Sequence, residues 1–301
     1  MLDVAMKKRP LIVGLAVLSG VFLFFWLLVF VTAGMMGRTS SFPIGEKVGV
    51  IEVTGVIASS KLINERIIRF KEDSSIKAVV LRVDSPGGGV GPSQEIYAEV
   101  KKLVAVKPVV VSMGSVAASG GYYIAAPAGK ILANPGTITG SIGVIMEFTN
   151  IKELLDKIGL SNQVVKSGQH KDIGSPIRPM TEADRKILQS MIDDVHLQFI
   201  TAVAEGRNID PDKVRLLADG RIYSGRQALE AGLVDQLGNL QDAIAVAGTM
   251  AGIKDTPRVV YPPREKAPFL EYFVEETISQ VRQELHEQSA GGLKYLWSGV
   301  K

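Results

Sequence analysis

Ser119 lies in a run of small residues that could carry nucleophilic chemistry. The run GSVAASGG at 114–121 follows the apolar segment PVVVS at 108–112 and precedes an apolar helix expected through Ala126. Small neighbours let backbone pass close to a substrate, and a helix N-terminus offers free N–H groups with positive partial charge. Acyl transfer needs such donors for its anionic intermediate. The same residues would also suit a tight turn with Ser119 as a helix N-cap, and the run alone slightly favours this turn.

The segment DSPGGG at 84–89 is the second candidate, because three glycines follow an apolar strand expected at 77–84. Glycine permits positive φ and leaves backbone N–H groups accessible. The segment lacks the Gly-Lys-Ser/Thr ending of a phosphate-binding loop and the Gly-x-Gly-x-x-Gly spacing of a dinucleotide site. Two roles remain for residues 84–89: a turn, or a set of backbone N–H donors for an oxyanion. The segment by itself favours the turn.

The segment KSGQHKD at 166–172 contains two candidate bases side by side. His170 would form a Ser-His-Asp arrangement with Asp172 or Asp84, whereas Lys171 would form a Ser-Lys dyad. A lysine is almost fully protonated at neutral pH, so it acts as a base only where burial lowers its pKa. An ordinary solvated lysine fits the sequence equally well.

Short apolar strands alternating with helices predict an α/β domain with a parallel sheet buried on both faces. The predicted strands are 47–57, 77–84, 108–112, 130–133, 142–146 and 162–166, and the predicted helices are 61–72, 92–105, 119–126 and 150–158. The run TEAD at 181–184 resembles a capping box, with Asp in place of the usual Glu or Gln, and predicts a helix ending near Gly206. Ser224 predicts another N-cap, with a helix that ends at Gly232.

Composition narrows the function classes. The chain has no cysteine, which excludes disulfides, thiolate metal sites and a cysteine nucleophile. Only three histidines are present, and we expect neither a metal nor an organic cofactor. The net charge is +3, from 34 basic and 31 acidic residues. The sequence has no concentrated basic stripe of the kind that would indicate a nucleic-acid partner.

The N-terminal segment predicts a membrane anchor. No charged residue occurs from Leu11 to Met36, and residues 11–32 would form a helix about 33 Å long, against a hydrocarbon core of about 30 Å. The basic cluster at 7–9 precedes this span and only Arg38 follows closely, which predicts a cytoplasmic N-terminus and an extracytoplasmic remainder. A signal peptide cleaved after Ala33 is the alternative, but its apolar region would be unusually long.

These features divide the chain into five predicted parts. They are a cytoplasmic N-terminus at 1–10, a transmembrane anchor at 11–33, a linker at 34–46, an α/β domain at 47–262, which the resemblance given next implies is a serine protease domain, and a C-terminal tail at 263–301. Within the tail, residues 269–286 predict a charged amphipathic helix.

Together and in this order, five motifs resemble the signal peptide peptidase A (protease IV) family in its short bacterial form. They are DSPGGGV at 84–90, SMGSVAASGGYYIA at 112–125, TGSIGVIM at 139–146, KSGQHKDIGSP at 166–176 and DGRIYSGRQALEAGLVD at 219–235. The resemblance implies an α/β fold similar to Clp protease and crotonase.

Carried over by position, the resemblance implies a role for each site residue. Ser119 becomes the nucleophile, and Lys171 becomes the general base at a separation of 171 − 119 = 52 residues. Ser141 becomes the hydroxyl that orients Lys171, and Gly88 and Gly120 supply oxyanion N–H groups. The choice of Lys171 over the neighbouring histidine rests on the resemblance alone.

The resemblance also implies a function: a membrane-anchored serine endopeptidase that degrades remnant signal peptides after export. It implies a ring-like homo-oligomer, such as an octamer, with the dyad either within one chain or across subunits. The alternatives are a crotonase-like acyl-CoA enzyme without a serine nucleophile and a non-catalytic membrane scaffold of the same fold. The Ser119 and Lys171 segments argue against both alternatives.

Overall fold

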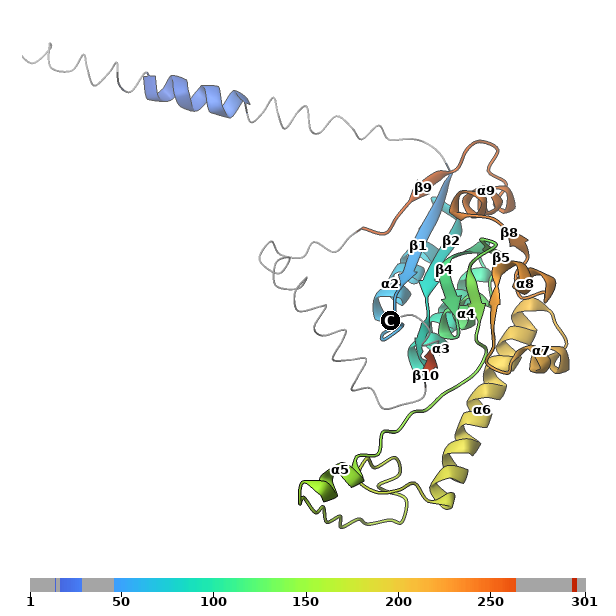
Figure 1. The fold of residues 1–301 in the computed structure, drawn as a ribbon. Helices are drawn as coiled ribbons and strands as arrows, with labels where there is room; N and C mark the ends of the chain where they lie inside the picture. Colours follow the sequence, from blue (N-terminus) through green and yellow to red (C-terminus); the bar gives the residue numbers. More distant parts are fainter. Residues whose placement is uncertain (1–13, 15–16, 29–45, 264–293, 297–301) are drawn as a thin grey trace, which may run out of the picture. The chain divides into compact units, whose positions relative to one another are not determined.

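The computed structural model describes residues 14, 17–28, 46–263 and 294–296. They fall into two units, 1–45 and 46–301, and the second contains the α/β domain (Figure 1). Residues 17–28 are helical. Within the described part of the chain, no helix combines the length and the apolar character needed to cross a membrane. Much of the predicted anchor and linker, and the predicted tail helix at 269–286, lie outside the described residues.

The main sheet of the described chain has eight strands: β1 (Lys47–Thr54), β2 (Ile76–Ser85), β4 (Val109–Ala118), β5 (Lys130–Ala133), β6 (Ile138–Gly140), β7 (Ile222–Ser224), β8 (Gln236–Leu237) and β9 (Arg258–Val260). Their path is β7-β6-β4-β2-β1-β9, and only the β6–β7 pair is antiparallel. The first half of β4 pairs with β5 and its last residues pair with β6. A separate antiparallel pair joins β3 (Gly87–Gly89) to β10 (Lys294–Leu296).

The helices of the described domain are α2 (Lys61–Glu72), α3 (Val90–Val104), α4 (Gly120–Ala125), α5 (Lys152–Lys157), α6 (Glu182–Arg207), α7 (Pro211–Leu217), α8 (Gly225–Glu230) and α9 (Leu240–Met250). Helices cover both faces of the sheet, whereas α5 lies away from it (Figure 1). Alternate β2 residues separate two cores, with Val79 and Leu81 packing toward α2, α3 and α4, and Val80 packing toward α9. Each buried aliphatic side chain contributes about 1.5–3 kcal/mol. The predicted α/β class is confirmed.

The predicted strands at 142–146 and 162–166 are wrong. Only an isolated bridge residue occurs, at Ile145. Gly140 and Ser141 both have positive φ, so the chain turns out of the sheet directly after β6. Residues 141–180, here called the excursion, leave the sheet with α5 as their one helix among the described residues (Figure 1). Val165 is fully exposed there, so the β-branched pair at 164–165 gains no strand partner.

Helix α6 links the excursion to the core. Thr181 and Asp184 form the predicted capping box in both directions, and the helix continues through Arg207, one residue beyond the predicted end. Phe199 and Val203 are fully buried in its second half. At Gly206 a Cβ would overlap the carbonyl oxygen of Ala126, immediately after α4. The last turn of α6 is therefore in direct backbone contact with the end of α4.

We predict that Gly206→Ala lowers the free energy of unfolding by about 1–3 kcal/mol, because the added methyl group meets rigid backbone. Chemical denaturation followed by circular dichroism measures this change. Gly91→Ala is the matched control, since a Cβ there meets nothing within 4 Å. We expect the control to retain wild-type stability or to gain up to about 1 kcal/mol in α3. Equal stabilities of the two variants would contradict the close contact.

Candidate active site

Ser119 occupies the junction between β4 and α4 in a conformation that few non-glycine residues adopt. Its φ is 53° and its ψ is −118°. Its backbone N–H donates to the Gly140 carbonyl at 2.8 Å, and its carbonyl accepts from the Tyr123 N–H at 2.8 Å. The residue is only 1% exposed. Both sides of the Ser119 peptide are thus fixed by hydrogen bonds within the core.

The hydroxyl of Ser119 is not used as a helix cap. Although Ser119 stands at the N-cap position of α4, its side chain makes no capping hydrogen bond. At the starts of α6 and α8, by contrast, Thr181 and Ser224 do accept from backbone N–H groups. The alternative role of Ser119 as an N-cap would use the hydroxyl in this capping bond. Because the bond is absent, the hydroxyl is available for another role.

Ser141 lies beside Ser119 because β4 and β6 are parallel neighbours. Ala118 pairs with Gly140, and each serine is the next residue along its own strand. Ser141 also has positive φ, at 49°, and is 8% exposed. Its N–H donates to the Arg221 carbonyl at 2.8 Å. Since parallel strands end at the same edge, the two serines share one edge of the sheet.

Gly88 and Gly120 are also brought together. A Cβ built on Gly120 would lie 3.2 Å from the Gly88 nitrogen and 2.6 Å from Ser93 Oγ. Ser93 in turn donates to the Gly89 carbonyl at 2.8 Å. Any side chain at position 120 would crowd this space, so glycine is required for the close approach of the two backbone segments.

The N–H of Gly88 points away from Ile57, its neighbour on one side. Ile57 uses both of its backbone groups on the flanking residues: its N–H donates to the Gly87 carbonyl at 2.8 Å, and its carbonyl accepts from the Gly89 N–H at 2.9 Å. Because backbone groups of successive strand residues alternate in direction, the Gly88 N–H faces the opposite edge of β3. That edge is where β10 lies.

Strand β10 was not predicted from the sequence. It pairs antiparallel with β3, with Tyr295 opposite Gly88. Three residues far along the chain carry no local pattern that specifies such a partner, because the pairing depends on the edge that β3 offers. The pair shows that extended peptide fits beside the Gly88 N–H.

Lys171 is not in contact with the other predicted site residues. It lies in the excursion, is exposed, and its backbone N–H donates to the Gly168 carbonyl at 3.2 Å. Among the described residues, no hydrogen bond or ion pair joins Lys171 to Ser119 or Ser141. One chain therefore gathers four of the five predicted residues and holds the lysine apart from them.

His170 has a different carboxylate partner from either one predicted. Its Nδ1 lies 3.3 Å from Asp184 Oδ1. Asp84 instead accepts a backbone N–H from β4, and Asp172 accepts from Lys166 at 2.6 Å and from an arginine. Neither of the carboxylates that the sequence offered for a Ser-His-Asp arrangement makes a recorded hydrogen bond or ion pair with His170. The sequence signalled Asp184 only as a capping residue.

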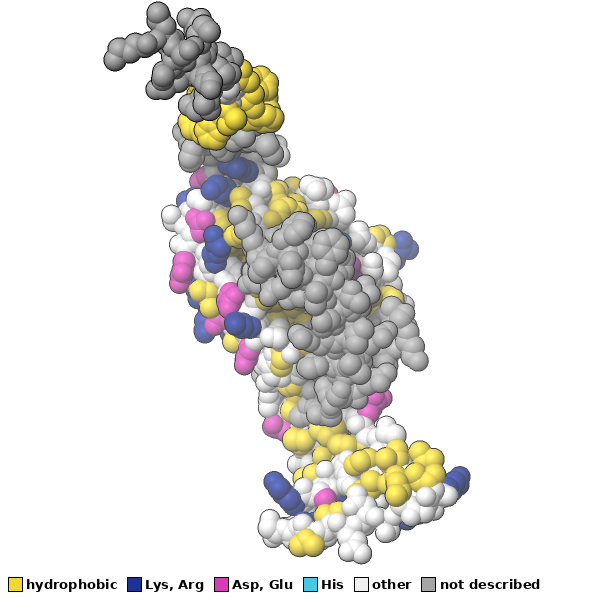
Figure 2. All heavy atoms as spheres, turned by 90° about the vertical axis from the view of Figure 1, so that its left-hand side faces the viewer, with side chains coloured by type: hydrophobic (Ala, Val, Ile, Leu, Met, Phe, Trp, Pro, Cys, Tyr) yellow, Lys and Arg dark blue, Asp and Glu magenta, His cyan; other side chains and the backbone are white. Residues whose placement is uncertain are grey.

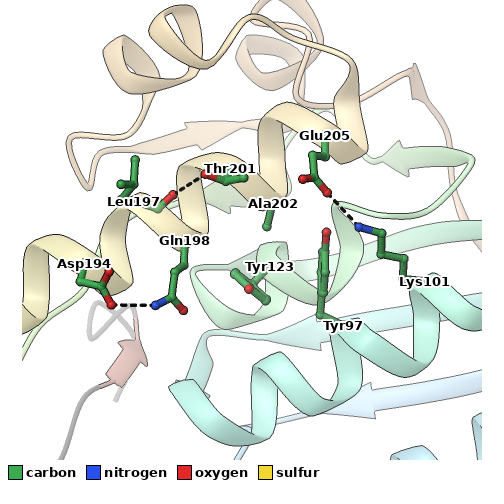
Figure 3. A pocket seen from close by; sticks show the side chains of 9 residues that line it. All are labelled: Tyr97, Lys101, Tyr123, Asp194, Leu197, Gln198, Thr201, Ala202 and Glu205. Atoms are coloured by element: carbon green, nitrogen blue, oxygen red, sulfur yellow. Dashed lines mark hydrogen bonds and ion pairs between the residues drawn. The ribbon is translucent and has the colours of Figure 1, made fainter.

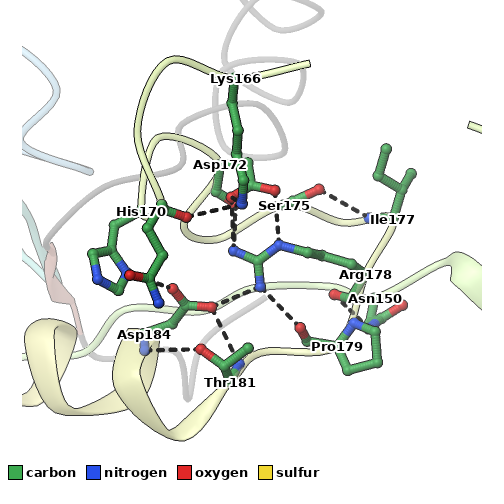
Figure 4. A network of polar contacts seen from close by, with 11 residues as sticks. Asn150, Lys166, His170, Asp172, Ser175, Ile177, Arg178, Pro179, Thr181 and Asp184 are labelled. Carbon is green, nitrogen blue, oxygen red and sulfur yellow. Dashed lines mark hydrogen bonds and ion pairs between the residues drawn. The ribbon is translucent and has the colours of Figure 1, made fainter. Parts of the chain in front are cut away.

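Arg178 connects the two carboxylates of this polar network (Figure 4). Its Nε donates to Asp172 Oδ2 at 2.9 Å, and its Nη1 donates to Asp184 Oδ2 at 2.6 Å. The hydrogen bonds from Arg178 hold the pKa of both carboxyl groups well below the usual range. Both carboxylates are therefore ionised at neutral pH.

A separate hollow of about 360 Å³ lies between α3, α4 and α6 (Figure 3). The ring centroids of Tyr97 and Tyr123 lie 4.9 Å apart there, and Lys101 pairs with Glu205 at 2.8 Å across the two helices. None of the predicted site residues lines this hollow. It marks the seam along which α6 packs on the domain.

The chain matches the family model for peptidase family S49 over residues 101–254. A provisionally named protease of Synechocystis sp. is 48% identical over 69% of this chain and 76% of its own length. A protein of Enterococcus faecium provisionally named signal peptide peptidase SppA is 40% identical over 66% of this chain and 62% of its own length. Protease 4 of Salmonella typhi is 41% identical over 60% of this chain and 29% of its own length. In the last two, the chain spans less than two thirds of the relative. On the motif run, the fold and these matches, this chain belongs to peptidase family S49.

Proposed function

We propose that this chain is a serine endopeptidase with Ser119 as nucleophile and Lys171 as general base. The observation that carries the proposal is the state of Ser119: buried, held at positive φ between two core hydrogen bonds, and with its side chain making no cap. Residues kept in such sparsely populated conformations cost about 1–3 kcal/mol and cluster at functional sites.

The proposed catalytic steps give each of these residues one role. Lys171 takes the proton from Ser119 Oγ as that oxygen bonds to the peptide carbonyl carbon. The N–H groups of Gly88 and Gly120 stabilise the oxyanion, and the hydroxyl of Ser141 orients the lysine amine. The leaving amine takes the proton as the C–N bond breaks. Water activated by Lys171 then hydrolyses the acyl-enzyme and restores the serine.

The pairing of β10 with β3 supports a peptide substrate. Antiparallel addition of an extended segment uses main-chain hydrogen bonds and accepts many side chains. We propose that the substrate peptide occupies the same edge of β3, with its carbonyl near Gly88. Remnant signal peptides are the proposed substrates, a class for which the Enterococcus faecium relative is named.

A second copy of the chain completes the proposed site. Lys171 is exposed on the excursion, whereas a lysine base must lose its water to become neutral. The excursion also exposes Leu154, Ile158 and Val165, and Figure 2 shows hydrophobic side chains gathered at the end of the domain that carries α5. Packing of this end against another subunit, in a ring such as an octamer, would bury both Lys171 and these apolar side chains.

The proposed setting is the outer face of the cell membrane. Residues 17–28 form a helix with exposed large apolar side chains, and a basic cluster at 7–9 precedes the apolar stretch. These features support a single-pass anchor with a cytoplasmic N-terminus and an extracytoplasmic protease domain. The domain itself is proposed to share the Clp protease and crotonase type of fold.

We predict that Ser119→Ala and Lys171→Ala each lower peptide cleavage by about 10³-fold or more, since each removes one half of the dyad. Cleavage of a fluorogenic apolar peptide measures the loss. A serine-directed fluorophosphonate probe should label the wild type and not Ser119→Ala. Lys157→Ala, at another exposed lysine of the excursion, is the matched control for Lys171→Ala and should keep wild-type activity. Full activity in Lys171→Ala with loss in His170→Ala would replace the dyad by a histidine base.

We predict that Gly120→Ala lowers kcat by about 10²–10³-fold, because the methyl group would lie 3.2 Å from the Gly88 nitrogen, where the oxyanion must bind. Since that methyl also meets Ser93 Oγ, Ser93→Ala is combined with it. The double variant relieves the crowding at Ser93 and should remain impaired. Recovery of wild-type kcat in the double variant would show that crowding at Ser93, and not loss of the oxyanion donor, caused the effect.

We predict that the full chain stays in the membrane pellet after an alkaline carbonate wash. Replacing Leu23 and Leu27 with arginine should release it, since each charge costs about 2.5–3.5 kcal/mol at the centre of a membrane helix. The intact mass tests the rival reading. A mature chain beginning near Gly34 would mean a cleaved signal peptide and would contradict the anchor.

A further inference from the structure

The two chain neighbours of Lys171 are both tied to one point in the structure. On one side, His170 Nδ1 lies 3.3 Å from Asp184 Oδ1. On the other side, the backbone carbonyl of Asp172 accepts from Arg178 Nη2 at 3.1 Å, and its carboxylate accepts from Arg178 Nε and Nη2 at 2.9 and 3.0 Å. Arg178 itself binds Asp184. Lys171 therefore sits between two anchored residues.

Asp184 is the point where these contacts converge. Its Oδ2 accepts from the Thr181 N–H at 3.1 Å and from Arg178 Nη1 at 2.6 Å, and its side chain is only 2% exposed. It stands in the first turn of α6, where the helix dipole favours a negative charge. A buried carboxylate with this many donors is a fixed anchor for the arginine.

Asp184 is in turn held in place relative to the domain core. Helix α6 buries Val195, Phe199 and Val203 against the core, and its last turn touches the backbone at the end of α4. A continuous chain of contacts thus runs from the helix that follows Ser119, along α6, through Asp184 and Arg178, to the peptide groups on either side of Lys171.

We propose that Arg178 is a positioning residue that holds the Lys171 segment at a fixed place relative to the start of α6. The proposal rests on the proposed function, in which Lys171 is the base. Arg178 makes bonds in three directions at once: to the Asp172 carboxylate, to the Asp172 carbonyl and to Asp184 (Figure 4). A planar guanidinium can do this, whereas the single ammonium of lysine cannot reproduce the fork.

The test measures peptide cleavage by Arg178→Ala and Arg178→Lys in the full-length chain. A base displaced by about 1 Å can lose about 10²-fold in rate, so we expect kcat to fall by about that factor in Arg178→Ala with KM nearly unchanged. Arg178→Lys should recover only part of the loss. Added guanidinium at millimolar concentration should partly restore Arg178→Ala and leave Arg178→Lys unchanged, because only the first leaves a vacant guanidinium site.

A double variant separates positioning from folding. If Arg178 acts through Lys171, then Arg178→Ala adds no further loss in a Lys171→Ala background. Arg215→Ala is the matched control, since Arg215 is an exposed arginine on α7 whose side chain makes no hydrogen bond or ion pair within the described residues. It should retain wild-type kcat. Thermal midpoints and subunit number are measured for every variant.

Three results would overturn the inference. Wild-type kcat in Arg178→Ala, while Lys171→Ala is inactive, would remove the role of Arg178 and leave the proposed function intact. A further large loss in the double variant, or wild-type kcat in Arg178→Lys, would also remove it, since either means that Arg178 acts elsewhere or as a simple charge. Full activity in Lys171→Ala would instead overturn the proposed function, and the positioning role with it.

Discussion

The hydrogen bond from the Ser119 N–H to the Gly140 carbonyl is the contact on which the rest of the site depends. It closes the ladder between β4 and β6 at the point where both strands end. Because it fixes the peptide before Ser119, the chain enters α4 through an unusual φ, and the serine side chain makes no capping hydrogen bond to the helix that it precedes. The same contact sets the neighbouring place of Ser141. A single backbone bond therefore positions two side chains from different parts of the sequence.

Helix α6 connects the core near Ser119 to the excursion. Its 26 residues span about 39 Å at 1.5 Å per residue. One end rests on the backbone after α4, and the other holds the polar network of Arg178 and Asp184. An α-helix packed by buried aromatic and aliphatic residues bends little. Helix α6 therefore holds the excursion at a fixed distance from the part of the core that contains Ser119. The excursion has few buried side chains of its own and depends on this helix for a defined position.

Local pattern was sufficient for the elements that bury a continuous apolar stripe. The strands around 47–57, 77–84 and 108–112, and the capping boxes at Thr181 and Ser224, all follow from short-range rules. The excursion was predicted wrongly because β-branched residues at 162–166 read as a strand, whereas a strand needs a partner edge that this part of the fold does not provide. The Asp184 partner of His170 and the pairing of β10 were missed because both depend on tertiary neighbours. The positions of Ser119, Ser141, Gly88 and Gly120 could be predicted from the motif run, but not the separation of Lys171 from them.

In the proposed function, the three residues of β10 compete with the substrate peptide for the same edge of β3. They take up the strand edge of β3 toward which the Gly88 N–H points. Because this segment is covalently part of the chain, its local concentration is set by the tether and not by the amount of protein present. In the proposed function, a substrate peptide must therefore displace a segment whose effective concentration does not fall on dilution. Because three residues offer few ladder hydrogen bonds, we expect longer extended peptides to displace β10 more readily than short ones, so that this edge would select substrates by length.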